Sequence, residues 1–147
     1  MKEYAPQNAS IALFRAGYVP YYTNFFTIDR IGLNNVYIAH EGQRDHGRNG
    51  VEYRNSLDYW LEQQPTFIET NLNTVSLLVN GDNAISSNSA EDIALFSQPD
   101  FIDNYALLKI RGGLQPIGSW FQRIDTLDPR CLQTVPGFSV AVCEITQ

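Results

Sequence analysis

The chain has 147 residues, of which 44% are hydrophobic and 12% aromatic, and its formal net charge is −6. A chain of this length is expected to form a single domain, residues 1–147, that buries a core without needing a metal or a disulfide. The acidic balance argues against nucleic acid or an anionic membrane as a partner, because both bind through clustered Lys and Arg.

In chain order, the hydrophobic pattern predicts mostly strands. Runs of aromatic and β-branched residues lie between turn signals made of Gly, Pro and Asn, as is typical of strands. The predicted strands are residues 11–14, 21–28, 36–39, 74–79, 105–110, 119–124 and 138–145. In the last of these, larger side chains alternate with smaller ones, so we expect this strand to lie inside a sheet.

Two segments have helical periodicity instead. Near residues 54–64, Leu57, Trp60 and Leu61 fall on one face, and Pro65 ends the pattern. A short helix is predicted near 90–97, after a capping-box spacing and before Pro99. The predicted fold is therefore mainly β, with α+β as the alternative. We expect an antiparallel β-sandwich or barrel that carries these two helices.

The tract at residues 40–50 contains both histidines of the chain, His40 and His46. Two metal-binding histidines on a helix lie four residues apart, whereas these are six apart with Gly42 between them. A metal held by His40, Asp45 and His46 is therefore a weak alternative, and so is a hydrolase-like enzyme that uses the same tract. The favoured interpretation is a polar, charge-neutral loop whose arginines contact a neighbour.

Other polar residues give weaker signals. Cys131 and Cys143 are compatible with one disulfide, and two free thiols fit at least as well. Four aspartates, at positions 100, 103, 125 and 128, resemble turn residues more than a calcium loop. No cofactor motif is present, and we predict no cofactor. The sequence shows neither a signal peptide nor a membrane segment, so a cytoplasmic or virion protein is expected.

The composition favours binding to other proteins. Lysine occurs only at positions 2 and 109, while interface cores are depleted in Lys, Glu and Asp and enriched in aromatic residues and Arg. The sequence thus predicts a non-enzymatic assembly protein that binds itself or a larger scaffold, such as a phage capsid-stabilising, neck or tail component. A sugar-binding or other ligand-binding β domain is a further alternative. The predicted contact residues are Arg44, Arg48, Arg54, Tyr21, Tyr22, Phe25 and Phe26.

Overall fold

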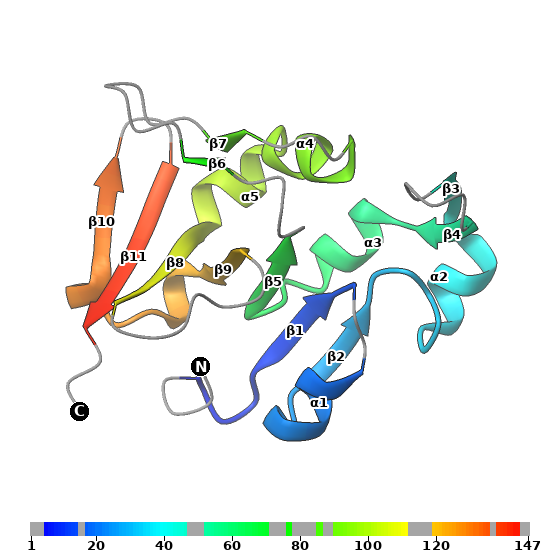
Figure 1. Ribbon diagram of the computed structural model, residues 1–147, viewed down its shortest axis with the longest axis horizontal. Coiled ribbons are helices and arrows are strands. Elements are labelled where there is room, and N and C mark those ends of the chain that lie inside the picture. The colour runs from blue at the N-terminus through cyan, green and yellow to red at the C-terminus, as the bar shows by residue number, and fades with distance from the viewer. Residues whose placement is uncertain are drawn as a thin grey trace. The chain divides into compact units, whose positions relative to one another are not determined.

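The computed structural model divides the chain into two compact units, Met1–Phe67 and Ile68–Gln147, which are called unit 1 and unit 2 below. The residues that it describes are 5–14, 17–46, 52–70, 76–77, 85–86, 90–111, 119–135 and 138–144. Helices and a mixed sheet give an α+β fold, the predicted alternative (Figure 1). The strand order is open, so the predicted closed barrel is wrong. The sandwich and the single domain stay predictions.

Unit 1 begins with a parallel strand pair. Strand β1 (Ser10–Leu13) is buried over its last three residues and pairs with β2 (Phe26–Asp29) in parallel, with Ala12 opposite Ile28. Two parallel neighbours need a crossover connection, which here contains the six-residue helix α1 (Tyr18–Thr23).

Helix α1 corrects the predicted strand at 21–28 in its first half. Pro20 is the third residue of the helix, a position whose backbone N–H would have no partner within the helix. Asn24 ends the helix in the left-handed conformation, with φ 60°, and its N–H bonds to the carbonyl of Pro20 at 2.9 Å. The strand begins only after this cap.

The predicted strand at 36–39 is also a helix, α2 (Val36–Glu41). The side chain of Asn35 caps it by accepting a hydrogen bond from the N–H of Ile38 at 3.0 Å. Before the cap, Gly32 has φ +78°, and a Cβ there would lie 2.9 Å from the backbone nitrogen of Ala39. This close approach requires glycine. Local capping thus outweighs the β propensity of a segment that contains Val36 and Ile38.

The tract after α2 is a β-hairpin rather than the predicted loop. Strand β3 (Gln43–His46) pairs antiparallel with β4 (Glu52–Asn55). Strand β4 includes the first residues of the helix predicted near 54–64. That helix is therefore shorter than expected, α3 (Leu57–Glu62), with Trp60 completely buried.

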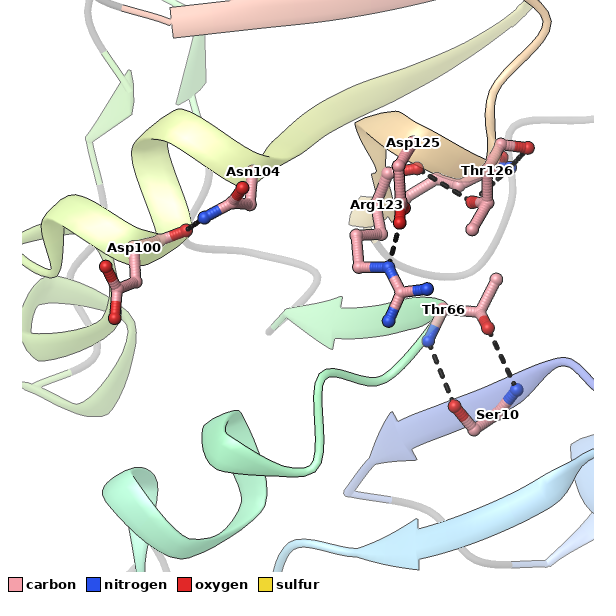
Figure 2. A network of polar contacts seen from close by, with 8 residues as sticks. Ser10, Thr66, Asp100, Asn104, Arg123, Asp125 and Thr126 are labelled. Atoms are coloured by element: carbon pink, nitrogen blue, oxygen red, sulfur yellow. Dashed lines mark hydrogen bonds and ion pairs between the residues drawn. The ribbon is translucent and has the colours of Figure 1, made fainter.

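A reciprocal pair of hydrogen bonds ties the start of unit 1 to its end. The N–H of Ser10 donates to Oγ1 of Thr66, and the N–H of Thr66 donates to Oγ of Ser10, both at 3.1 Å (Figure 2). The next strand, β5 (Phe67–Thr70), is buried along its whole length and was not predicted.

In unit 2, the short pair β6 (Ser76–Leu77) and β7 (Ile85–Ser86) precedes two helices. Helix α4 (Ala90–Phe96) confirms the short helix predicted near 90–97. Helix α5 (Pro99–Asn104) was missed, because Pro99 was taken only as a stop signal although it also begins the next helix. No helix within the described part of the chain is long and apolar enough to cross a membrane.

Four strands of unit 2 pair in the order β10-β11-β8-β9. Strands β8 (Tyr105–Arg111) and β9 (Ser119–Arg123) confirm two predicted strands. Short 3₁₀ turns at Ile124–Thr126 and Pro129–Cys131 lead to β10 (Leu132–Val135) and β11 (Phe138–Glu144). Strand β11 pairs with β10 on one side and, in parallel, with β8 on the other, which confirms its predicted interior position.

Aromatic rings form the core of unit 2. Phe101, Tyr105 and Phe121 are each at most 4% exposed, and Phe96 lies beside them. The Phe101 ring lies 4.9 Å from that of Phe121 and 5.3 Å from that of Tyr105, measured between centroids. These distances are typical of favourable aromatic pairs, so the cluster joins α4 and α5 to β8 and β9.

Candidate protein-interaction surface

Exposed aromatic rings gather in α1 and at the start of β2. Tyr21 and Tyr22 are 82% and 67% exposed, and their ring centroids lie 5.2 Å apart at right angles. Phe26 is 71% exposed at the first position of β2. Tyrosine and phenylalanine bury roughly 150 to 250 Å² each when they pack, so these three rings leave apolar surface accessible to a partner.

The exposed apolar residues continue through the turn into α2. Leu33 and Val36 are more than 70% exposed, and Tyr37 is 47% exposed and stacks on Tyr59 of α3 with 4.1 Å between ring centroids. The six large hydrophobic side chains of residues 21–37 that are exposed form a set named here the aromatic segment: Tyr21, Tyr22, Phe26, Leu33, Val36 and Tyr37. In the described part of unit 2, only Ile93 and Ile102 are comparable.

Phe25 differs from the other three aromatic residues that the sequence suggested as contacts. It is half-buried and stacks on Phe67, with ring centroids 5.6 Å apart and planes 12° apart. Its ring therefore packs within unit 1, whereas Tyr21, Tyr22 and Phe26 remain accessible.

A buried arginine supports the segment from inside. Arg30 is completely buried, and its guanidinium carbon lies 4.0 Å from the centroid of the Phe14 ring and 4.3 Å from that of Trp60. A guanidinium close to two rings gains cation–π attraction from each of them, which is strongest in a site without water. Sequence inspection missed this arrangement, because the three residues are far apart in the chain.

The turn that follows is held by the buried carboxylate of Asp29. Its Oδ1 accepts a hydrogen bond from the N–H of Ile31 at 3.1 Å, and its Oδ2 accepts one from the N–H of Asn34 at 2.7 Å. These bonds, with the cap at Asn35, fix the backbone from residue 29 to α2. Leu33, Val36 and Tyr37 are thus presented to solvent on an ordered support, which lowers the entropy lost on binding.

The predicted contact arginines fall on the hairpin after α2. Arg44 is exposed on β3, and the register places Arg54 of β4 directly opposite it. Arg48 lies outside the described residues. His40 is exposed in the last turn of α2, and His46 is the final residue of β3. The structure therefore brings the positions of two of the three arginines together.

The acidic turns of unit 2 are paired with arginines. Nε of Arg123 lies 2.6 Å from Oδ1 of Asp125 (Figure 2). The Arg130 guanidinium bonds to both oxygens of Asp128 and lowers the pKa of that carboxyl to about 2. Asp128 also accepts the N–H of Arg130 at 2.9 Å, as a turn-forming aspartate does.

The described residues offer little to a metal. Among them, no three His, Cys, Asp or Glu side chains form a metal-binding group. The metal alternative at His40, Asp45 and His46 stays a prediction, because the side chains of Asp45 and His46 lie outside the description. Cys131 is disulfide-bonded, and the chain has one other cysteine, Cys143. The interpretation of two free thiols is therefore wrong.

Comparison with known proteins identifies a family but no activity. No curated protein and no solved structure matches the chain. A family model described as "Domain of unknown function (DUF8728)" matches residues 1–120, which include all of unit 1, with the aromatic segment and the hairpin, and the helices of unit 2. The chain belongs to this family of domains of unknown function.

Proposed function

We propose that this protein is a non-enzymatic assembly subunit that binds copies of itself through the aromatic segment. The observation that carries the proposal is the exposure of Tyr21, Tyr22 and Phe26 at 82%, 67% and 71%. Tyrosine is among the residues that dominate interface energetics, and several exposed apolar residues within one short stretch of chain suit an interaction site.

The energetics support an interface with more than these three rings. Complete burial of one such side chain contributes about 1.5 to 3 kcal/mol, so three contribute about 4.5 to 9 kcal/mol. Association itself costs about 4 to 15 kcal/mol in lost freedom of motion. Three rings alone therefore barely offset that cost, and stable binding needs further contacts, which Leu33, Val36 and Tyr37 can supply.

The disulfide at Cys131 bears on where such an assembly works. Disulfides persist in oxidising surroundings and on virion surfaces, and they are rare in the cytosol. A virion component, such as a capsid, neck or tail subunit, is compatible with both the disulfide and assembly. This setting is part of the proposal.

Light scattering coupled to size-exclusion chromatography tests the proposal. The native chain should form a defined oligomer that dissociates on dilution. Tyr21→Ser with Phe26→Ser should weaken association roughly thirtyfold or more, because hot-spot truncations cost about 2 kcal/mol or more. The matched control is Ile93→Ser, since this exposed residue lies on α4 of unit 2 at 51% exposure.

The control variant should associate like the native chain. A native chain that remains monomeric at every concentration would overturn the proposal. Equal weakening by the unit 1 and unit 2 substitutions would overturn the role of the aromatic segment. Circular dichroism on each variant establishes that a loss of association is not a loss of fold.

A further inference from the structure

The charge of the protein is divided unevenly between the two units. Unit 1 has six basic and seven acidic residues, for a net charge of −1, whereas unit 2 has four basic and nine acidic residues, for a net charge of −5. Together they account for the formal charge of −6. Two copies of the chain can therefore lower their repulsion by placing basic residues of unit 1 against acidic residues of unit 2.

On unit 2, two exposed aspartates of α5 have no ion-pair partner among the residues that the structure describes. Asp125 and Asp128 each bond to a nearby arginine, as described above. Asp100 and Asp103 are exposed on α5, and within the described part of the chain neither carboxylate forms an ion pair. Residues three apart are neighbours on one helix face, so the two like charges repel each other. On the same helical turn, Nδ2 of Asn104 donates a hydrogen bond to the backbone carbonyl of Asp100 at 2.7 Å (Figure 2).

On unit 1, the hairpin presents the complementary arrangement. Arg44 and Arg54 are direct cross-strand partners, an arrangement that destabilises a ladder when the charges are alike. Alternation along the strands places His46 and Glu52 at positions on the same face as the two arginines. Arg44 is exposed and forms no ion pair within the part of the chain that is described.

We propose that the face of the hairpin at Arg44 and Arg54 docks on the Asp100–Asp103 face of α5 in a second copy of this chain. Both pairs have a similar spacing, since directly opposite strand residues lie about 4.5 to 5.5 Å apart and helix residues three apart about 5 to 6 Å. A guanidinium binds a carboxylate through two parallel hydrogen bonds, so each arginine meets one aspartate. Docking removes a like-charge repulsion from both partners.

This contact joins unit 1 of one copy to unit 2 of another. When it is reciprocal between two copies it closes a symmetric dimer, and when it is not it produces a ring or a filament. The inference rests on the proposed assembly function. It adds which surface of one copy contacts which surface of the other. In this scheme the aromatic segment supplies most of the affinity, and the hairpin selects the orientation.

Charge reversal in two complementary variants tests the contact. One variant has Arg44→Glu with Arg54→Glu, and the other has Asp100→Arg with Asp103→Arg. Each alone should associate roughly a hundredfold more weakly than the native chain, because like charges then face each other. An equimolar mixture of the two should recover association, since an acidic hairpin meets a basic helix and a basic hairpin meets an acidic one. Only a contact between different copies can be rescued by mixing.

The control carries the same change in charge at locally paired aspartates, Asp125→Arg with Asp128→Arg, and should associate nearly like the native chain. The contact is wrong if the two reversed variants associate normally, or if their mixture fails to recover. Normal association of those variants, together with loss of association in the Tyr21 and Phe26 variant, would leave the proposed function intact and remove only the hairpin contact. A native chain that is monomeric would overturn both.

High salt separates the contribution of the charged hairpin contact from that of the apolar contacts. At 1 M salt the Debye length is about 3 Å, so exposed charge pairs are strongly screened while apolar contacts persist. Native association should weaken with salt until it matches that of the charge-reversed variants at the same salt. Association that is independent of salt in the native chain would contradict the hairpin contact.

Discussion

The two units use their aromatic residues in different ways. In unit 2, Phe101, Tyr105 and Phe121 are buried against one another. In unit 1, Tyr21, Tyr22 and Phe26 are mostly exposed, although the unit has its own buried rings. Aromatic residues therefore contribute to the core in both units and, in unit 1, to accessible surface as well, and composition alone does not separate these uses.

The units also differ in the charges that they bury. Unit 1 buries Arg30 close to two rings, with Asp29 next to it in the chain. In the described part of unit 2, three acids are buried: Glu69 of β5 at 7% exposure, and Glu91 and Asp92 in the first turn of α4 at 6% and 0% exposure. The first turn of a helix favours negative charge. For Arg30, and for Glu91 and Asp92, a local feature thus compensates part of the cost of desolvation.

Phe101→Ala should have the largest effect on stability. Its comparison with Phe26→Ala tests the difference between the buried rings of unit 2 and the exposed rings of unit 1. Removing a buried ring from a packed cluster costs about 3 to 5 kcal/mol. Phe26→Ala should change the free energy of unfolding of the dilute monomer by less than about 1 kcal/mol, since surface substitutions usually change little. Urea denaturation of both variants measures the difference. Similar losses in the two would contradict the division into a buried and an exposed aromatic set.

Arg30→Leu should have the next largest effect. It keeps much of the bulk but removes both cation–π contacts, for a loss of about 2 kcal/mol. Arg30→Lys should not restore stability, because an ammonium lacks the planar surface that stacks on the rings of Phe14 and Trp60. The same denaturation experiment measures both, with Arg44→Leu as the exposed control in the dilute monomer. Full stability of Arg30→Lys would show that charge alone matters there.

Tyr105→Phe should have the smallest effect near neutral pH and a distinct one in alkali. Burial raises the pKa of the Tyr105 hydroxyl well above its usual range, against a smaller opposing effect of Arg123. The folded state therefore keeps the proton longer than the unfolded state. The resulting stability is complete below about pH 10, the usual value for tyrosine, and is lost as the pH rises above it.

The phenylalanine variant lacks this titration, so its stability relative to the native chain should rise as the pH passes about 10. Urea denaturation at a series of pH values, with Tyr21→Phe on an exposed ring as the control, provides the measurement. An equal pH dependence in the native and Tyr105→Phe chains would show that burial of Tyr105 does not couple to folding.

Each unit was predicted in part: β1 and most of α3 in unit 1, and β8, β9, β11 and α4 in unit 2, whereas α5 and β10 were missed. Strands β8, β9 and β11 and helix α4 follow from local hydrophobic pattern, which is the signal that sequence reasoning reads best. In unit 1, two predicted strands became helix at α1 and α2. Capping by Asn24 and Asn35 decided the conformation there, and aromatic and β-branched content pointed the other way.

The candidate site was predicted only in part. Tyr21, Tyr22, Phe26 and Arg44 were named from their residue types, and all four side chains are exposed. Which ring of the Phe25–Phe26 pair is accessible depends on packing against Phe67, which is distant in sequence. The opposition of Arg44 and Arg54 depends on the register of a hairpin whose strands were not recognised. Both features depend on tertiary structure, which no local sequence pattern encodes.

The reciprocal bonds between Ser10 and Thr66 have a consequence for the order of folding during synthesis. The two residues are 56 positions apart, so β1 cannot acquire these bonds until Thr66 has left the ribosome. Closing so long a stretch of chain carries an entropic cost that only the finished unit repays. We therefore expect the nascent chain to expose Tyr21, Tyr22 and Phe26 before unit 1 is complete. Under the proposed function, association between neighbouring nascent chains would then begin before either copy has been released.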